Sequence, residues 1–211
     1  MTLAAPAPIR VLIVDDHQMV RDGIAALLNR QQDMAAVGEA ADGLEAVHQF
    51  RALSPDVTLM DLQMREMGGV EAIKAIRGLA PGARILVLTT YPGDAQAVRA
   101  MRAGAAGYLL KNCIRRELID AIRSVHTGRH AISPDIAHDL AAHALDEPLT
   151  DREVAVLRLV AEGHANKQIG RVLHLSTDTI KAHLKTIFAK LGVDDRTHAV
   201  TVATRRGFFE R

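Results

Sequence analysis

The segment Ile-Arg-Val-Leu-Ile-Val-Asp-Asp, residues 9–16, places a short and mostly apolar run directly before two aspartates. A run of this length that ends at polar residues predicts a buried strand, Ile9–Val14. An amphipathic stretch follows over His17–Asn29, where Val20, Ile24 and Leu28 fall on one side of a helix. The chain therefore begins with a strand, an acidic pair and a helix.

This alternation continues along the chain. Four more strands are predicted at Met34–Ala40, Val57–Met60, Ile85–Leu88 and Tyr108–Leu110. Four more helices are predicted at Gly43–Leu53, Gly69–Leu79, Asp94–Ala103 and Arg115–Thr127. Strands that alternate with helices favour a parallel sheet covered on both faces. Right-handed crossovers then indicate a doubly wound, five-stranded α/β sheet, for which we choose the flavodoxin-like strand order 2-1-3-4-5.

The strand signals stop in the last third of the chain. Four helices are predicted there, at Asp151–Glu162, Lys167–Leu173, Thr177–Leu191 and Arg196–Thr204. Between the two parts, glycine, proline and scattered histidines indicate a linker that can hold a short helix over Pro134–Ala144. We therefore expect an α/β domain at 9–126, a linker at 127–147 and an all-α four-helix domain at 148–211.

Charge is distributed unevenly between these parts. The 211 residues carry a net charge of +1, and 48% of them are hydrophobic, enough for a real core. Residues 1–126 hold 14 basic and 14 acidic residues, whereas residues 148–211 hold 11 basic and 7 acidic, a net of +4. This asymmetry suggests two tasks, one of which involves nucleic acid.

Cysteine content and hydropathy exclude several classes. Cys113 is the one cysteine, so the chain cannot form an internal disulfide or a cysteine-based zinc site, and a cytoplasmic location fits. Met1–Pro8 has no long apolar run and is not expected to be a signal peptide. No 18 consecutive residues are apolar, so no membrane contact through a spanning helix is expected.

Polar residues follow four of the predicted strands where each strand ends. These residues are Asp15, Asp16, Asp61, Thr89 and Lys111. The carboxyl ends of parallel strands meet at one edge of the sheet, and strands one and three are neighbours at the topological switch point, where ligands bind. We therefore expect these side chains to converge in one crevice.

This combination of side chains suits phosphoryl transfer. Three neighbouring carboxylates repel one another and require a cation, and hard oxygen ligands in an open site suit Mg²⁺. A carboxylate can attack a phosphoryl group to form an aspartyl phosphate. The ammonium of Lys111 can neutralise the transferring group, and the hydroxyl of Thr89 can donate a hydrogen bond to it.

Residues 9–126 resemble the receiver domain of response regulators. The resemblance rests on Val-Asp-Asp-His at 14–17, Met-Asp-Leu-Gln-Met at 60–64, Leu-Thr-Thr at 88–90 and Gly-Tyr-Leu-Leu-Lys at 107–111. It implies that Asp61 is the phosphoacceptor, that Thr89 and Lys111 contact the phosphoryl group, and that Tyr108 moves with Thr89 as a switch. It also implies that Mg²⁺ is held by Asp15, Asp16, Asp61 and the backbone carbonyl of Gln63.

Three residues depart from the usual receiver pattern. Arg65 and Gly68 stand where the family usually has proline and aspartate, in the loop that follows the phosphoacceptor. Asn112 follows Lys111 in place of the proline of many receivers, as it does among relatives with this kind of output domain. The loop after Asp61 is thus where a difference in phosphorylation lifetime is expected.

The basic C-terminal part has the pattern of a helix-turn-helix. Thr150 and Glu153 form a predicted capping box, and Ser176 is a second predicted N-cap. A short helix, a tight turn and a longer helix follow one another, as in this motif. The residues expected to face inward from the first two helices are Val154, Leu157, Val160, Ala161, Ile169, Val172 and Leu173.

On the longer helix, Lys181 and Lys185 are four residues apart and share a face. In this motif the second helix enters the major groove of DNA. Lys167 and the hydroxyls of Thr177 and Thr179 can meet phosphates. A pair of lysines on an isolated helix would otherwise only form its solvated face.

Residues 149–204 resemble the helix-turn-helix of LuxR/NarL-type regulators. The resemblance rests on Leu-Thr-Asp-Arg-Glu at 149–153, Ala-Glu-Gly-His-Ala-Asn-Lys-Gln-Ile at 161–169, Leu-Ser-Thr-Asp-Thr-Ile-Lys-Ala-His at 175–183 and Ala-Lys-Leu-Gly-Val-Asp-Asp-Arg at 189–196. It implies that Lys181, Ala182 and Lys185 face the bases and that Arg196–Thr204 forms a dimer contact. Gly170 departs from the usual alanine and should weaken its helix by roughly 1 kcal/mol.

The sequence thus predicts a cytoplasmic response regulator of a two-component system rather than an enzyme. A sensor histidine kinase would phosphorylate Asp61 and thereby control homodimerisation and binding to double-stranded DNA. Two alternatives stay open. A phosphatase on the same fold would need an acid/base near Asp61, but Gln63 replaces the second aspartate of an Asp-X-Asp motif. A phosphorylation-independent DNA-binding regulator would use the receiver only as a dimerisation module.

Overall fold

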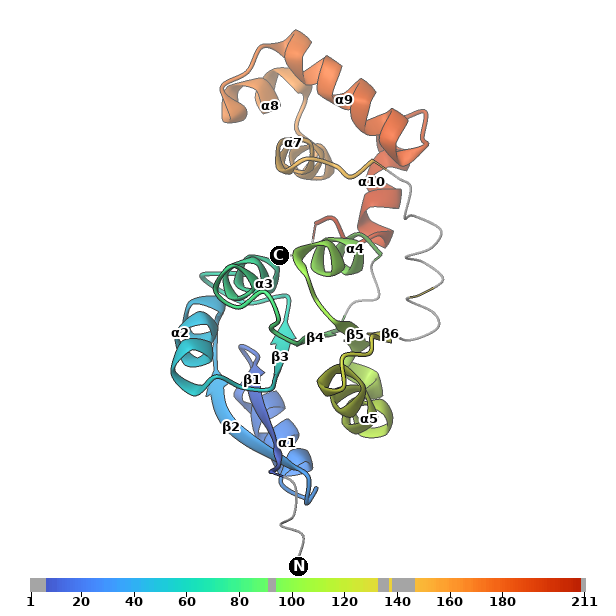
Figure 1. Cartoon of the computed structure of the whole chain (residues 1–211). Coiled ribbons are helices and arrows are strands. Elements are labelled where there is room, and N and C mark those ends of the chain that lie inside the picture. The colour runs from blue at the N-terminus through green and yellow to red at the C-terminus, as the bar shows by residue number, and fades with distance from the viewer. Residues whose placement is uncertain (1–6, 91–93, 133–136, 138–146, 210–211) are drawn as a thin grey trace, which may run out of the picture. The chain divides into compact units, whose positions relative to one another are not determined.

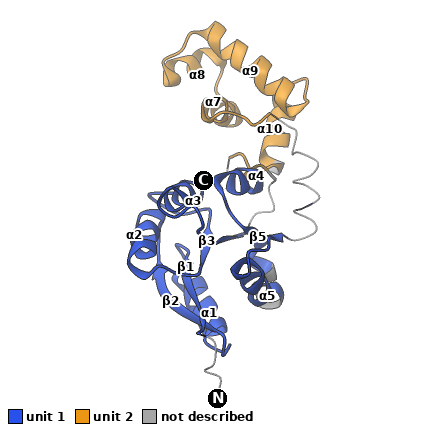
Figure 2. Ribbon diagram, viewed as in Figure 1, with its two compact units in different colours: residues 1–92, 97–138, 211 blue, residues 93–96, 139–210 orange. Residues whose placement is uncertain are grey.

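The computed structural model of the chain describes residues 7–90, 94–132, 137 and 147–209. The chain divides into two compact units, one mainly from residues 1–138 and the other mainly from residues 139–210 (Figure 2). In the residues that the structure describes, the first unit contains strands and helices and the second contains helices, as the sequence predicts.

The first unit is organised around a parallel sheet with the strand order β2-β1-β3-β4-β5-β6. The strands are β1 (Ile9–Val14), β2 (Met34–Ala40), β3 (Val57–Asp61), β4 (Ile85–Thr89), β5 (Gly107–Leu110) and β6 (Ala131–Ile132). The predicted order of the first five strands is confirmed, and β1 and β3 are neighbours. The sequence missed β6, because two residues are too short for a periodic signal.

Strand β6 extends the sheet from within the segment predicted as linker, where Gly107 pairs with Ala131 and Tyr108 with Ile132. The short helix expected over Pro134–Ala144 falls almost entirely outside the described residues. Two residues of the expected linker therefore belong to the edge of the sheet.

Helices cover both faces of the sheet, with α1 and α5 on one face and α2, α3 and α4 on the other (Figure 1). Their bounds are α1 (Gln18–Leu28), α2 (Gly43–Leu53), α3 (Gly69–Leu79), α4 (Asp94–Ala103) and α5 (Ile114–His126), with the 3₁₀ turn η1 (Lys111–Cys113) before α5. The predicted layering on a doubly wound sheet is confirmed.

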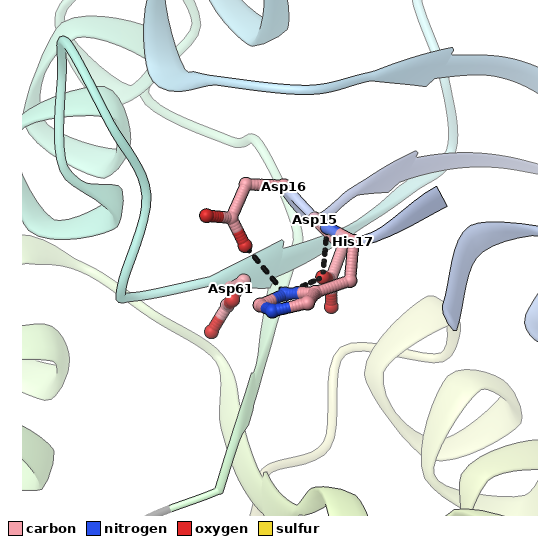
Figure 3. A group of neighbouring side chains, drawn as sticks. All are labelled: Asp15, Asp16, His17 and Asp61. Atoms are coloured by element: carbon pink, nitrogen blue, oxygen red, sulfur yellow. Dashed lines mark hydrogen bonds and ion pairs between the residues drawn. The ribbon is translucent and has the colours of Figure 1, made fainter. Parts of the chain in front are cut away.

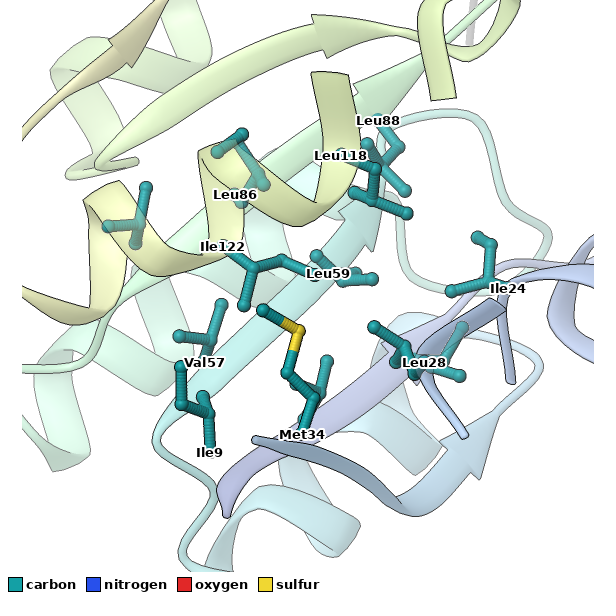
Figure 4. Packing of buried hydrophobic residues seen from close by; sticks show 14 of the residues in the cluster. Ile9, Ile24, Leu28, Met34, Val57, Leu59, Leu86, Leu88, Leu118 and Ile122 are labelled. Carbon is teal, nitrogen blue, oxygen red and sulfur yellow. The ribbon is translucent and has the colours of Figure 1, made fainter. Parts of the chain in front are cut away.

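One hydrophobic core of this unit lies between the sheet and helices α1 and α5 (Figure 4). Alternate strand residues such as Val57 and Leu59 point into it and meet Leu28 of α1 and Leu118 and Ile122 of α5. All five are at most 1% exposed. Full burial of each such side chain stabilises the fold by about 1.5–3 kcal/mol, which fixes the register of the strands.

Between residues 147 and 209, the second unit contains α7 (Asp151–Ala161), α8 (Asn166–Leu173), α9 (Thr177–Leu191) and α10 (Arg196–Arg205). Its core includes Val156, Leu157, Ile169, Ile180 and Ile187, none of which is exposed. Within the described residues, no helix of either unit is long and apolar enough to cross a membrane.

Local capping signals place the ends of these helices. The Thr150 Oγ1 accepts a hydrogen bond from the backbone N–H of Glu153, and the Glu153 carboxylate accepts one from the N–H of Thr150, so the predicted capping box is confirmed. The predicted cap at Ser176 is confirmed as well, since its hydroxyl accepts from the N–H of Thr179 at 3.0 Å. The turn between α8 and α9 passes through His174, whose φ of 54° is left-handed.

Two residues expected in this core lie outside it. Val172 is 53% exposed, and Ala161 is exposed too. Helix α8 buries the arc of Ile169 and Gly170, and at 100° per residue Val172 points roughly 110° away from the centre of that arc. On α7 the buried arc runs through Glu153 and Val156 as well as the expected Leu157 and Val160.

Candidate functional site

The carboxyl ends of β1, β3, β4 and β5 bring the predicted polar residues to one edge of the sheet. Asp61 is the last residue of β3 and pairs with Leu88 of β4, and Thr89, the last residue of β4, pairs with Leu110 of β5. Asp15 follows β1, and its backbone N–H donates to the carbonyl of Ala40 at 3.1 Å. The parallel register thus delivers side chains from distant parts of the chain to the same place.

Lys111 connects two of the three carboxylates. Its Nζ lies 2.6 Å from Oδ2 of Asp15 and 2.8 Å from Oδ2 of Asp61. Asp15 and Asp61 are buried and Lys111 is nearly so, with exposed side-chain fractions of 2%, 4% and 12%. Ion pairs that are this well buried are screened little by salt, so they hold the groups in place.

Asp16 and His17 complete the cluster on its more open side (Figure 3). The Nδ1 atom of His17 lies 2.6 Å from Oδ1 of Asp16 and 3.3 Å from Oδ1 of Asp15. The Asp16 side chain is 21% exposed, and that of His17 is 70% exposed. The sequence reasoning assigned no role to His17, although it directly follows the acidic pair.

The crevice contains more negative than positive charge. Burial raises the pKa of the Asp61 carboxyl, the Lys111 ammonium opposes that rise, and the charge of Asp15 adds to it. Burial alone would lower the pKa of Lys111, but its contacts with Asp15 and Asp61 hold that pKa above the usual value. One ammonium therefore does not neutralise the neighbouring carboxylates, and a further cation would be stabilised here.

The donor set fits a hard divalent cation such as Mg²⁺. Asp15, Asp16, His17 and Asp61 each offer one ligand atom, and these atoms lie within 4.8 Å of one another. Carboxylate oxygens dominate the set, and Asp16 and His17 are accessible enough to leave room for water ligands. The backbone of Gln63 is adjacent, since its N–H donates to Oδ1 of Asp61 at 3.4 Å.

Thr89 and Tyr108, which would act together as a switch by resemblance to receiver domains, are both fully buried. Thr89 ends β4, and Tyr108 lies in β5 opposite Val87 of β4. Both have an exposed fraction of 0%. Tyr108 therefore belongs to the packed interior of this conformation.

The loop after Asp61 is held at both ends by glycine backbone. The N–H of Gly69 donates to the carbonyl of Leu62 at 3.0 Å, and the N–H of Gly43 donates to the carbonyl of Met67 at 3.1 Å. A Cβ atom on Gly69 would lie 2.1 Å from the carbonyl oxygen of Asp61, so no larger residue fits there without a shift. Gly68, which replaces the usual aspartate, leaves α3 without a side-chain cap.

The residues predicted to contact DNA lie at the surface of the second unit. Lys167, Thr177, Thr179, Lys181, Ala182 and Lys185 are all exposed. Lys181 and Asp178 form a surface ion pair at 3.0 Å, with exposed side-chain fractions of 65% and 88%. The hydroxyl of Thr179 lies 2.8 Å from that of Ser176 at the N-terminus of α9. The lysines are thus accessible on a helix that begins at a well-formed cap.

Sequence reasoning also missed Arg21, which contacts the crevice through the backbone of Asp15, and its partner Glu39. Arg21 of α1 is buried and donates a hydrogen bond to the backbone carbonyl of Asp15, and it pairs with Glu39 of β2. The available signal was the position of Arg21 on the same side of the helix as Ile24 and Leu28, where a charged residue is unusual.

Comparison with known proteins agrees with this geometry in both units. Residues 11–123 match the family described as "Response regulator receiver domain". Residues 147–203 match the family described as "Bacterial regulatory proteins, luxR family". The first match includes the crevice, and the second includes α7, α8 and α9.

Individual relatives match nearly the whole chain. The response regulator protein VraR of Staphylococcus aureus is 38% identical over 207 residues, which cover 96% of this chain and 99% of VraR. RcsB of Salmonella enterica serovar Typhimurium, solved bound to promoter P1flhDC in the presence of phosphomimetic BeF3-, is 28% identical, with a TM-score of 0.69 over 93% of this chain and 98% of that one. A structure of two RcsB dimers bound to two parallel DNAs is 27% identical, with a TM-score of 0.66 over 94% of this chain and 98% of that one.

A parallel α/β receiver unit with an acidic crevice, followed by a helical unit with a helix-turn-helix, defines a transcription regulator rather than an enzyme. The chain belongs to the two-component response regulators that have a receiver domain and a LuxR-type DNA-binding domain.

Proposed function

We propose that Asp61 is the phosphoacceptor and that its phosphorylation controls DNA binding by the second unit. The observation that carries the proposal is the position of Lys111, whose Nζ lies within 2.8 Å of both Asp15 and Asp61 at the carboxyl edge of the sheet. The functional boundaries we propose are a receiver at 9–126, a connecting segment at 127–147 and a DNA-binding domain at 148–211.

In the proposed reaction, a carboxylate oxygen of Asp61 attacks the phosphorus of a phosphohistidine on a sensor kinase, or of a small phosphodonor. A bond from that oxygen to phosphorus forms, and the bond from phosphorus to the leaving group breaks, so the leaving group departs with the electron pair. The Lys111 ammonium is already beside Asp61 and neutralises the transferring charge. Thr89, at the end of the next strand, supplies a hydroxyl for a phosphoryl oxygen.

Asp15, Asp16, Asp61 and the backbone carbonyl of Gln63 would hold Mg²⁺. When bound, the ion supplies positive charge to the oxygens of the transferring group. Its fit is supported by the clustered ligand atoms and by the excess of carboxylates over ammonium groups in the crevice.

The phosphorylated state would be stabilised by contacts that the unphosphorylated state lacks. A phosphoryl group on Asp61 can bind both the Lys111 ammonium and the Thr89 hydroxyl, and such differential contacts are what shifts a two-state equilibrium. Tyr108, buried one strand away, would move with Thr89 and pass the change along the sheet edge.

The second unit would bind double-stranded DNA as part of a homodimer. Lys181, Ala182 and Lys185 would face the bases, while Lys167, Thr177 and Thr179 would contact phosphates. Helix α10 would supply the dimer contact. The net charge of +4 on residues 148–211, the exposed lysines and the DNA-bound relatives support this assignment. A regulator of this kind acts on the chromosome, so we propose a cytoplasmic location.

Intact-mass measurement after incubation with acetyl phosphate and Mg²⁺ tests the proposal. We expect wild type to gain one phosphoryl group and Asp61→Asn to gain none, while Asp120→Asn, which changes an exposed aspartate on α5, behaves as wild type. A folded wild type that gains nothing, at reaction times short enough to detect a labile adduct, would favour a regulator that binds DNA without phosphorylation.

A further inference from the structure

Arg21 is a charged residue on the buried side of α1, which is otherwise apolar. It lies on α1 with Ile24 and Leu28, and its side chain is only 10% exposed. Arginine is almost never this deeply buried unless its guanidinium is paired. The contacts of Arg21 therefore show which parts of the chain its guanidinium holds together.

The guanidinium of Arg21 joins three parts of the chain. Nη1 donates to the backbone carbonyl of Asp15 at 2.6 Å, Nε donates to the carboxylate of Glu39 on β2 at 3.1 Å, and Nη2 donates to the side-chain oxygen of Gln18. The Gln18 amide also donates to Glu39, at 3.4 Å. A planar guanidinium holds several acceptors in a fixed arrangement, which a lysine cannot do.

These contacts fix the backbone at Asp15 from both sides. The N–H of Asp15 donates to the carbonyl of Ala40 at the end of β2, and the carbonyl of Asp15 accepts from Arg21. The N–H of His17 then donates to Oδ1 of Asp15 at 2.9 Å. The peptide groups around Asp15 are thus tied to β2 and α1, and the orientation of its carboxylate depends on them.

We infer that Arg21, oriented by Glu39, is a positioning residue that holds the Asp15–His17 segment in the geometry that binds Mg²⁺. The inference rests on the proposed function of the crevice. Arg21 would touch neither the metal nor the phosphoryl group, and it would act through the backbone of Asp15. Residues that orient metal ligands in this way affect metal affinity by about 10- to 100-fold.

A second arginine–carboxylate pair in the same unit, at the surface, provides a control. Arg123 donates to the carboxylate of Asp33 at 2.9 and 3.1 Å and so also joins a helix to another part of the chain. Both side chains are more than 40% exposed, and neither has a contact with the crevice among the described interactions. Loss of this pair tests whether any broken arginine pair disturbs the site.

The test compares full-length wild type, Arg21→Met, Arg21→Lys, Glu39→Gln and Arg123→Met. Mg²⁺ affinity is measured by isothermal titration calorimetry without a phosphodonor, and thermal unfolding is followed without Mg²⁺. We expect Arg21→Met to bind Mg²⁺ at least about tenfold more weakly, Arg21→Lys to recover part of the loss, and Arg123→Met to match wild type. Saturating Mg²⁺ should restore most of the phosphorylation rate of Arg21→Met.

Unchanged Mg²⁺ affinity in folded Arg21→Met would overturn the inference, as would an equal loss in Arg123→Met. If Arg21→Met does not fold, Arg21→Lys and Glu39→Gln decide in the same assay, because each keeps part of the network. In that case wild-type affinity in both would contradict the positioning role. Failure of the proposed function looks different, since wild type itself would then bind no Mg²⁺ or Asp61→Asn would still be phosphorylated.

Discussion

The crevice of the receiver and helix α9 of the second unit both place a lysine beside an aspartate, but one pair is buried and the other is exposed. Lys111 and Asp61 are 2.8 Å apart and nearly buried, whereas Lys181 and Asp178 are 3.0 Å apart and mostly exposed. Water and salt screen the exposed pair, which is therefore worth little, while the buried pair is screened weakly. Pairs with similar distances therefore behave differently. Lys111 stays bound to its carboxylates, whereas Lys181 can exchange Asp178 for a ligand.

The largest effect is expected from removing the buried ammonium. Lys111→Met leaves Asp15 and Asp61 without their shared partner, so the transferring phosphoryl group loses a preorganised positive charge. We expect phosphorylation by acetyl phosphate to slow by about 100-fold or more. Intact mass against time measures the rate, with Lys74→Met, on the exposed side of α3, as the control. A rate within threefold of wild type would mean that burial of the pair has no chemical role.

A buried pair in the DNA-binding domain extends the comparison to stability. Lys190 lies 2.9 Å from Glu153, and their side chains are 8% and 7% exposed. Glu153→Gln should destabilise this domain by about 1.5–3 kcal/mol at pH 7, because the buried ammonium loses its buried charged partner and keeps Glu147, at 3.3 Å, whose side chain is 77% exposed. Circular dichroism of the full chain during denaturation measures the change. Glu162→Gln, which alters a carboxylate whose side chain is 52% exposed, should change stability little.

The Glu153–Lys190 pair should also make the stability of this domain depend on pH, in a direction that follows from the pKa of Glu153. Burial alone would raise the pKa of Glu153, but hydrogen bonds from Thr150 and Lys190 lower it below the usual value of 4.5. A lowered folded-state pKa contributes stability that is present above pH 4.5 and is lost as the pH falls through the folded value. The difference between wild type and Glu153→Gln should therefore shrink below pH 4.5. A difference that grows in acid would contradict this assignment.

For the exposed lysines, the expected effects are on binding rather than on folding. Lys185→Ala should weaken binding to a duplex selected from a random pool by about 1–3 kcal/mol of binding free energy, since Lys185 is assigned to a base. Its effect on binding to random DNA should be much smaller. Lys167→Ala should weaken both duplexes alike and reduce the salt slope by about 1, since Lys167 is assigned to a phosphate. Fluorescence anisotropy in a salt series separates these outcomes, with Lys74→Ala as the control. Equal effects of the two lysines on both duplexes would show that the assignments are wrong.

The smallest effect is expected at Gly170. Helix propensity alone predicts that Gly170→Ala stabilises α8 by about 1 kcal/mol. In the structure, however, a Cβ at this position would lie 2.7 Å from the carbonyl oxygen of Leu175, and the Leu175 N–H donates to the carbonyl of Gly170 at 2.8 Å. The turn into α9 must shift to accept the methyl group, so we expect no gain or a small loss in thermal stability. A clear rise in the midpoint temperature of thermal unfolding of Gly170→Ala would show that the turn shifts at little cost.

The sequence was sufficient to predict that five polar side chains converge at one edge of the sheet, namely Asp15, Asp16, Asp61, Thr89 and Lys111. Each follows or ends a strand, and parallel strands place their carboxyl ends together whatever the side-chain details. The exposure of the lysines on α9 was predictable for a similar reason, because helical periodicity separates them from the buried Ile180 and Leu184.

What the sequence could not predict depends on packing between elements. The contact of Arg21 with the carbonyl of Asp15 requires α1 to lie at a particular position against β2, and nothing in the helical pattern sets that position. Val172 was expected to be buried because it lies three residues after Ile169, but α8 packs through Ile169 and Gly170, and Val172 points away from the centre of that side and is 53% exposed. The two residues of β6 form a strand only because the edge of β5 is there to pair with them.

The most direct measurement is the affinity of the full chain for a selected duplex, before and after treatment with acetyl phosphate and Mg²⁺. We expect phosphorylated wild type to bind at least about tenfold more tightly, which corresponds to a coupling of about 1.4 kcal/mol, and Asp61→Asn to show no change. Equal affinities for phosphorylated and unphosphorylated wild type, with the adduct verified by mass, would contradict control of DNA binding by the crevice. The receiver would then be left as a dimerisation module.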